Sequence, residues 1–176
     1  MRCPYCAHQN IPGVDQCASC GHDLAGLDLL ESKASFAGQL MTDRVGDLTM
    51  GPALVLSSQD TVRTAVETMR EARHGCVLIA DGSDLTGIFT ERDLLTRVVQ
   101  QGKEPANTTL SEVMTRRPFT LNPSDPPAFA IHRMVSEGLR HLPVIDQGRL
   151  LGFASVRNVL SYIDQDVIGL AVSTDS

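Results

Sequence analysis

An internal repeat constrains the fold of this chain more than any other feature of its sequence. When the chain is shifted along itself by 65 residues, residues 45–98 align with residues 110–163 without a gap. Aligned identical pairs include Leu56 with Leu121, Asp60 with Asp125, Ala65 with Ala130, Met69 with Met134, Asp81 with Asp146, Gly87 with Gly152, Arg92 with Arg157 and Leu95 with Leu160. A self-match of this kind predicts two copies of one structural unit.

Each copy shows the same succession of patterns. A short extended run (53–56 or 118–121) leads through a polar turn to an amphipathic helix, with hydrophobic residues spaced i, i+3, i+4, i+7 from residue 62 or 127. We expect Asp60 and Asp125 to cap these helices, with Pro126 and Pro127 in the first turn of the second. Two strands follow (76–80 and 85–89, or 142–146 and 150–154), and then a final helix (91–100 or 156–164). The prediction is an α/β (α+β) fold of two β-α-β-β-α units.

The phrases "GIFTERD" (87–93) and "GFASVRN" (152–158) occupy matching places in the two copies. In the first, Thr90 and Asp93 would lie at the N-terminus of a helix, where free N–H groups favour an anion. The Asp93 carboxylate could accept both hydrogens of a ribose diol, and Gly87 would allow a close approach. The same spacing is also an ordinary helix-capping arrangement, and the sequence leaves both interpretations open.

These phrases, together with "RHLPVID", "LLGFASVRNVL" and "TGIFTERDLL", resemble the CBS domain (the cystathionine β-synthase type). Two such domains in tandem form a CBS pair, or Bateman module. The resemblance covers about residues 45–164. It implies two units packed through their sheets around a pseudo-twofold axis, clefts that bind adenosyl ligands, and frequent assembly into a disc-shaped homodimer.

The resemblance, read with the residue chemistry, gives a candidate ligand set. In the second copy Asn158 replaces the carboxylate, and an amide is a weaker diol partner, so we expect the ribose on the first copy. The candidates for binding a phosphate are Arg140 and His141, together with Arg92, Arg157, Arg116 and Arg117. For the last four, exposed turn or helix positions without a ligand are the alternative. Base contacts would come from residues 53–55 and 118–120 and from the strands beginning at Cys76 and Leu142. The candidate ligand-binding residues are Gly87, Thr90, Arg92, Asp93, Arg140, His141, Ser155 and Asn158.

Four of the five cysteines lie in the first twenty residues, in "CPYCAHQNIPGVDQCASCGHDL". Cys3 with Cys6 and Cys17 with Cys20 form two CxxC pairs, which predict a four-thiolate structural zinc site without an open position for catalysis. Disulfides and a redox-active CxxC are the alternatives, and His8 and His22 lie just outside the pairs. The fifth cysteine, Cys76, is expected to be a buried strand residue.

This N-terminal stretch resembles the zinc ribbon (rubredoxin-like) modules, whose usual form is "CPxCG…CxxCGxxL". Here Ala7 replaces the first glycine, while Gly21 keeps the second. Such ribbons often bind nucleic acid or protein. Because Arg2 is the only Lys or Arg in this stretch, opposed by Asp15, we expect a protein contact or a structural role.

The composition narrows the functional classes. The net charge is −6, aromatic residues make up 4% and tryptophan is absent, which argues against a nucleic-acid surface. Without a signal-like or membrane-spanning segment, a cytoplasmic location is expected. The expected domains are a zinc ribbon (1–24), a helical linker (25–44), CBS 1 (45–100), CBS 2 (110–164) and a tail (165–176).

Two functions follow as hypotheses. The first is a regulatory sensor that binds AMP, ADP, ATP, NAD, S-adenosylmethionine or another adenosyl ligand. The second is a ligand-independent dimeric scaffold that uses the ribbon to contact a protein partner. An enzyme is not expected, because the sequence shows no hydrolytic triad, P-loop or Rossmann fingerprint.

Overall fold

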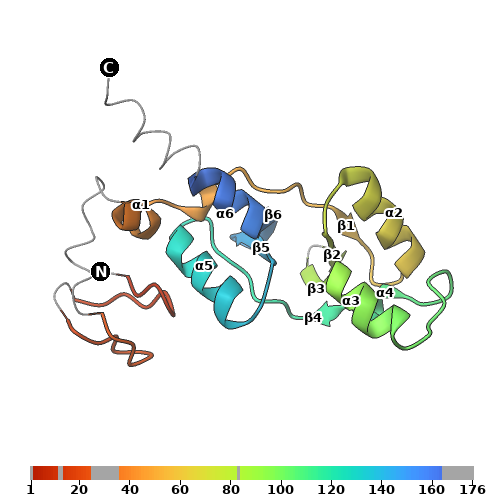
Figure 1. Cartoon of the computed structure of the whole chain (residues 1–176), viewed down its shortest axis with the longest axis horizontal. Helices are drawn as coiled ribbons and strands as arrows, with labels where there is room; N and C mark the ends of the chain where they lie inside the picture. The colour runs from red at the N-terminus through yellow and green to blue at the C-terminus, as the bar shows by residue number, and fades with distance from the viewer. Residues whose placement is uncertain (1, 12–13, 25–35, 83, 164–176) are drawn as a thin grey trace, which may run out of the picture. The chain divides into compact units, whose positions relative to one another are not determined.

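The computed structural model describes residues 2–11, 14–24, 36–82 and 84–163 (Figure 1). The fold is mixed α/β, as the sequence predicts. The chain divides into two compact units. The ribbon unit comprises residues 1–50, 121–142 and 154–176, and the sheet unit comprises residues 51–120 and 143–153.

The sheet unit is built on a four-stranded sheet in the order β1-β2-β3-β4. The strands β2 and β3 form an antiparallel hairpin, β1 joins β2 in parallel, and β4 joins β3 antiparallel. Helix α2 packs on this sheet and buries Val62, Ala65 and Met69 against Val77 and Phe89. The bounds are β1 Val55–Leu56, α2 Val62–Ala72, β2 Cys76–Asp81, β3 Asp84–Thr90 and β4 Thr115–Arg116.

The described part of the ribbon unit holds the N-terminal cysteines and three α-helices: α1 (Phe36–Thr42), α5 (Pro127–Ser136) and α6 (Val156–Tyr162). Helices α1 and α6 both pack against α5 (Figure 1). Of the expected linker helix, residues 25–35 lie outside the described residues, as does the expected tail from residue 165. The two-stranded sheet of β5 (His141–Asp146) and β6 (Arg149–Ser155) contributes residues to both units.

The predicted strand pairs 76–80 with 85–89 and 142–146 with 150–154 are confirmed. The predicted final helices are confirmed over the described residues. The first of them begins as α3 (Glu91–Asp93) and continues as a π-helical segment, η3 (Leu94–Val99). Of the extended runs predicted at 53–56 and 118–121, the first contains β1, and in the second Leu121 forms an isolated β-bridge. The strand β4, in which Thr115 and Arg116 pair with Ile88 and Gly87 of β3, was not predicted from the sequence.

The predicted aspartate caps are wrong, whereas Pro127 lies in the first turn of α5 as expected. Helix α2 is capped by Thr61, whose side chain accepts the N–H of Thr64, and the cap position of α5 is Pro126. The two aspartates instead accept hydrogen bonds within the turns that precede the helices. Asp60 accepts the N–H of Ser57, and Asp125 accepts the N–H of Asn122, each at 2.8 Å. Each carboxylate therefore closes the turn before its helix.

The segment that leads into each repeat is bound to the turn of the other repeat. Leu110 donates its N–H to the carbonyl of Asp60, and Val45 donates to the carbonyl of Asp125, both at 2.8 Å. These two bonds are related by the 65-residue offset at both ends. The short helices in the leading segments are η2 (Val45–Asp47) and α4 (Leu110–Val113). Each turn is therefore hydrogen-bonded to the first residue of the other copy, a contact that the repeat pattern by itself does not reveal.

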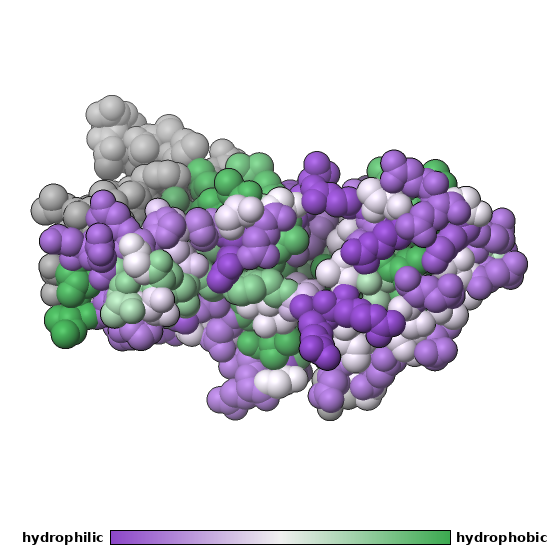
Figure 2. Space-filling model, turned by 90° about the horizontal axis from the view of Figure 1, so that it is seen from below, coloured by the Kyte–Doolittle hydropathy of each residue, from purple (hydrophilic) through white to green (hydrophobic). Residues whose placement is uncertain are grey.

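The face seen in Figure 2 is mostly hydrophilic, with hydrophobic residues showing as separate patches. Repeat-related Leu95 and Leu160 are 61% and 60% exposed, and each lies in the final helical segment of its copy. Within the described ranges, no helix combines the length and the hydrophobicity that crossing a lipid bilayer requires.

Candidate functional site

The four N-terminal cysteines form one cluster. Their Sγ atoms all lie within 4.8 Å of one another, with 3.7 Å between Cys3 and Cys20 and 3.5 Å between Cys6 and Cys17. Tetrahedral zinc with Zn–S bonds of about 2.3 Å places its sulfurs about 3.8 Å apart. The arrangement of the thiols therefore fits a four-thiolate metal ion.

Backbone geometry and polar donors support the sulfurs. The N–H of Tyr5 lies 3.4 Å from Cys3 Sγ, and the side-chain amide of Asn10 lies 3.5 Å from Cys17 Sγ. The positions that follow the two CxxC pairs both have a left-handed backbone, with φ of 61° at Ala7 and 68° at Gly21. The two turns have the same shape, although only one of them has the glycine that this shape favours.

The pKa values of the thiols differ across the cluster. Burial raises the pKa of Cys3 to about 12. Burial opposes ionisation of Cys17 as well, but the N–H groups of Cys20 and Ser19 outweigh it and lower the pKa of Cys17 to about 5. A metal ion would take all four ligands as thiolates, so its binding releases protons.

The two nearby histidines have other surroundings. The ring of His22 stacks on Tyr5 with 3.5 Å between centroids, and His8 is exposed. The ring of His132, on α5, meets Tyr5 edge-on at 4.4 Å. In the described part of the chain, the metal-ligand cluster comprises the four cysteines.

Thr90 and Asp93 form a reciprocal cap at the start of α3. Asp93 Oδ2 accepts the N–H of Thr90 at 3.0 Å and its hydroxyl at 2.7 Å, and the Asp93 side chain is nearly buried. The other oxygen, Oδ1, accepts the hydroxyl of Thr115 at 3.2 Å and lies 3.3 Å from Arg97 Nε. Both carboxylate oxygens therefore have partners within the protein.

The matching residues of the second copy form the same cap with a different outer partner. Asn158 Oδ1 accepts the N–H and hydroxyl of Ser155, at 2.9 and 2.5 Å. Its amide nitrogen donates to the carbonyl oxygen of Thr49 at 2.5 Å. A carboxylate has no hydrogen to offer this carbonyl, which gives a structural reason for asparagine at this position.

The glycines that open the two phrases lie against other chain segments. A Cβ atom at Gly87 would lie 2.4 Å from Met114 Sδ, and one at Gly152 would lie 2.4 Å from the carbonyl oxygen of Gly51. Both glycines are thus needed for packing, whether or not a ligand approaches them.

The remaining candidates are mostly exposed, and the carbonyl of Arg140 accepts the N–H of Val156 at the start of α6. Arg92 and Arg157 are exposed on their helices, Arg140 is exposed before β5, and His141 is half-buried at its start. Arg116 donates to the carbonyl of Ser111 at 2.6 Å. Cys76 is fully buried, and burial followed by the charge of Glu91 raises its pKa to about 12, which argues against a nucleophile.

Sequence reasoning missed two residues at the first site. Arg97 follows Asp93 by four residues, the spacing at which helical charges meet, and could have been found from that signal. Thr115 lies 22 residues from Asp93, and no local pattern connects the two.

Comparisons with known proteins agree with the repeat. The family model described as "CBS domain" matches residues 38–100 and 110–165. The CBS domain-containing protein CBSCBSPB2 of Arabidopsis thaliana is 34% identical over 117 residues, which are 66% of this chain and 22% of that protein. The matched region thus spans about a fifth of that relative.

Solved structures show the same fold. A signal-transduction protein with CBS domains from Burkholderia ambifaria matches with a TM-score of 0.63 and 29% identity, covering 79% of this chain and 93% of that one. The structure of CBSX2 in complex with AMP matches with a TM-score of 0.61 and 24% identity, covering 70% and 98%. The chain belongs to the CBS domain family and carries a tandem pair of these domains.

Proposed function

We propose that this CBS-domain regulatory protein senses an adenine nucleotide or another adenosyl ligand, and that it carries a structural zinc ion. The observation that carries the proposal is the paired Thr90 and Asp93, which bring a hydroxyl and a carboxylate together at the first turn of α3. A carboxylate can accept both hydrogens of a ribose diol, and a neighbouring hydroxyl can reach the sugar or a phosphate.

The contacts of Asp93 define what a ligand must do. Its Oδ1 already interacts with Thr115 and Arg97, so a diol must share this oxygen or replace one of the two partners. A carboxylate oxygen has two lone pairs, so Oδ1 can accept a ribose hydroxyl beside the Thr115 hydroxyl if Arg97 moves away. We infer that a bound diol displaces the side chain of Arg97, which is 41% exposed, and leaves the nearly buried carboxylate of Asp93 in place.

The two sites are proposed to differ. The amide nitrogen of Asn158 donates to the carbonyl of Thr49, its oxygen accepts the N–H and hydroxyl of Ser155, and it lacks the negative charge of Asp93. We therefore place the ribose at Gly87, Thr90 and Asp93, with Arg92 available for a phosphate. Ser155, Asn158, Arg140 and His141 are assigned a weaker second site. The same-fold protein CBSX2 binds AMP, in keeping with the ligand class.

A thermal-shift panel tests this function. Zinc-loaded protein would be heated with millimolar AMP, ADP, ATP, NAD or S-adenosylmethionine. A ligand at a hundredfold excess over its dissociation constant stabilises the native state by about 2.7 kcal/mol. We expect one ligand to raise the midpoint of the wild type and of Asn158→Ala, but not that of Asp93→Ala. Equal shifts in wild type and Asp93→Ala would refute the assigned site.

A second candidate function, a ligand-independent scaffold, is favoured by one observation. Leu95 and Val99 lie exposed on η3, and Leu160 and Val156 lie exposed on α6, so each copy leaves a hydrophobic surface uncovered. Exposed hydrophobic surface of this kind fits a homodimer contact. Light scattering of the wild type and of Leu95→Glu with Leu160→Glu tests it: the scaffold function requires a dimer that the double variant loses, and a monomeric wild type excludes it.

The proposed domains keep the ribbon (1–24), the linker (25–44), the two CBS units (45–100 and 110–164) and the tail (165–176). We propose a binding role without catalysis. For the metal, Cys3, Cys6, Cys17 and Cys20 are the proposed zinc ligands. Elemental analysis after purification would show one zinc per chain, and the variant Cys6→Ser with Cys20→Ser would show none.

A further inference from the structure

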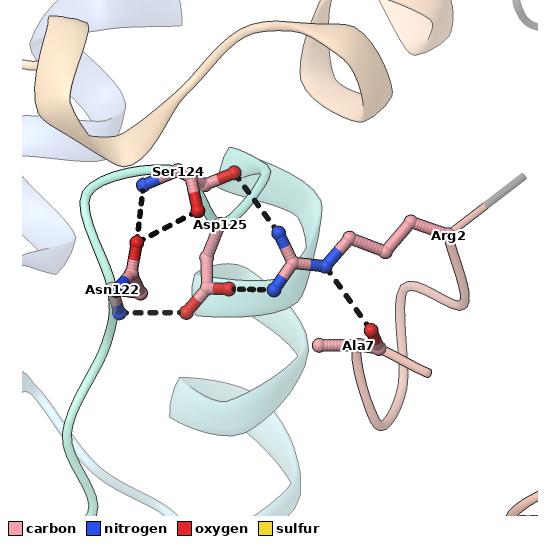
Figure 3. A network of polar contacts seen from close by, with 5 residues as sticks. All are labelled: Arg2, Ala7, Asn122, Ser124 and Asp125. Carbon is pink, nitrogen blue, oxygen red and sulfur yellow. Dashed lines mark hydrogen bonds and ion pairs between the residues drawn. The ribbon is translucent and has the colours of Figure 1, made fainter. Parts of the chain in front are cut away.

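The ribbon's Arg2 is bound by the second repeat of the same chain. Arg2 Nη2 lies 2.5 Å from Asp125 Oδ1, and Nη1 donates to the carbonyl of Ser124 at 3.1 Å (Figure 3). Both acceptors belong to the turn that precedes α5. The Asp125 side chain is 5% exposed and that of Arg2 is 34% exposed, so the pair is partly shielded from water. Charge-assisted bonds of this kind are stronger than neutral ones.

The repeat provides an internal comparison for this contact. Asp60 closes the equivalent turn of the first repeat with the same N–H bond at the same length. Among the described residues, the ion pairs reach Asp125 but not Asp60. The turn itself therefore forms without an arginine, and the Arg2 contact is an addition specific to the second repeat.

The contacting residues of the ribbon lie in the turn that carries Cys3 and Cys6. Arg2 directly precedes Cys3, and its Nε donates to the carbonyl of Ala7 at 3.1 Å (Figure 3). Tyr5 lies between Cys3 and Cys6 and contacts His132 of α5. A metal ion that orders this turn therefore also orders the two side chains that meet the second repeat.

The turn at 122–125 is also hydrogen-bonded to the segment 45–49, which leads to the second candidate ligand site. The carbonyl of Pro123 accepts the N–H of Gly46 at 2.9 Å, and that of Asp125 accepts the N–H of Val45. Three residues further on, the carbonyl of Thr49 accepts the amide of Asn158. A continuous set of contacts thus runs from the cysteines to the second copy of the repeated phrase.

We propose that the metal-loaded ribbon is an intramolecular clamp on the second CBS repeat. Metal binding positions Arg2 and Tyr5, these fasten the turn at 122–125, and the turn stabilises the segment 45–49 at the second site. Because linkage is reciprocal, the contact with the second repeat raises the metal affinity of the ribbon by the same factor by which metal binding strengthens that contact. The clamp rests on the proposed metal site and is independent of the adenosyl ligand.

Hydrogen exchange of the full chain, with zinc and after chelation, tests the clamp. We expect chelation to speed exchange at 45–49 and 122–125 but to leave the repeat-equivalent segments 110–114 and 57–60 unchanged. Zinc-loaded Arg2→Gln should show the same selective increase, and Arg2→Lys a smaller one. Equal exchange with and without zinc at 122–125, or an equal increase in both repeats, would overturn the clamp.

Zinc affinity, measured by competition with a chromophoric chelator, provides the reciprocal test. Asp125→Asn keeps an oxygen for the N–H of Asn122 but loses its charge. We therefore expect the dissociation constant for zinc to rise at least about fivefold in this variant. Asp60→Asn is the matched control and should bind zinc like the wild type. Unchanged affinity in Asp125→Asn refutes the clamp alone. A wild type that binds no zinc refutes the metal site, and the clamp with it.

Discussion

The side-chain amide of Asn158 donates to the backbone carbonyl of Thr49 at 2.5 Å, and the two residues are 109 positions apart. The repeat-equivalent Asp93 has a hydroxyl and a guanidinium as outer partners instead. One copy thus offers hydrogen-bond donors to a carboxylate, and the other offers an acceptor to an amide. The Asp-to-Asn difference between the phrases matches the protein groups around it.

Exchanging these residues should therefore destabilise the protein at either position. Asn158→Asp sets a carboxylate oxygen against the Thr49 carbonyl and should lower the free energy of unfolding by about 1 kcal/mol. Asp93→Asn sets an amide against donors at a nearly buried position and should cost about 1 to 3 kcal/mol. Urea unfolding of both variants checks this, and a stabilised Asn158→Asp would contradict it.

The two phrase glycines should differ in their tolerance of alanine. At Gly152 a new Cβ meets the backbone carbonyl of Gly51, which is held by the N–H of Phe153, and φ is 157°. At Gly87 it meets the Met114 side chain, which is flexible. We expect Gly87→Ala to lower the free energy of unfolding by about 1 to 3 kcal/mol, and Gly152→Ala to lower it by more. Thermal unfolding of the two variants side by side would contradict this if Gly87→Ala were the less stable.

Restoring the missing glycine of the ribbon should strengthen metal binding. Ala7 adopts a φ of 61°, a left-handed conformation that costs a residue with a side chain about 1 to 2 kcal/mol. Ala7→Gly removes this cost in the folded ribbon, although it also makes the unfolded chain more flexible. We expect tighter zinc binding for Ala7→Gly and weaker binding for Gly21→Ala by competition titration. Weaker binding by Ala7→Gly would show that the strain is not relieved.

Protonation of His132 should lower the stability of the zinc-saturated protein as the pH is lowered. Burial, followed by the charges of Arg133 and His22, lowers the pKa of His132 below its usual 6.5, while Glu137 opposes this. The unfolded chain then binds the proton more readily, so the stabilisation is present above pH 6.5 and is lost as the pH falls toward the folded-state pKa.

His132→Phe keeps an aromatic ring beside Tyr5 but cannot titrate. The fall in melting temperature between about pH 7.5 and about pH 5.5 should be smaller in this variant than in the wild type. The exposed His8, replaced by Phe, is the matched control. An equal fall in wild type and His132→Phe would show that this residue does not carry the pH dependence.

Local sequence patterns predicted the hairpin strands and most of the helical residues correctly. Hydrophobic runs such as residues 76–80 are separated by short polar turns, and both signals act over a few residues. The helix caps were misplaced because Thr61 competes with Asp60 for the cap, and the carboxylate instead closes the preceding turn. A two-residue strand such as β4 is too short to leave a periodic pattern.

The composition of the candidate sites was harder to predict. The reciprocal caps at Thr90 and Ser155 follow from the spacing of the phrase. Their outer partners do not, since Thr115 and Thr49 are supplied by distant segments. The same holds for Arg2 and Asp125, which are 123 positions apart. The ligand assignment itself stays a prediction.

Titration calorimetry of the zinc-loaded chain tests the central claim most directly. The ligand selected by the thermal-shift panel would be titrated into the wild type, Asp93→Ala and Asn158→Ala. We predict one strong site per chain, lost in Asp93→Ala and retained in Asn158→Ala. Binding that survives in Asp93→Ala, or that disappears only in Asn158→Ala, would contradict the account and move the ligand away from the first phrase.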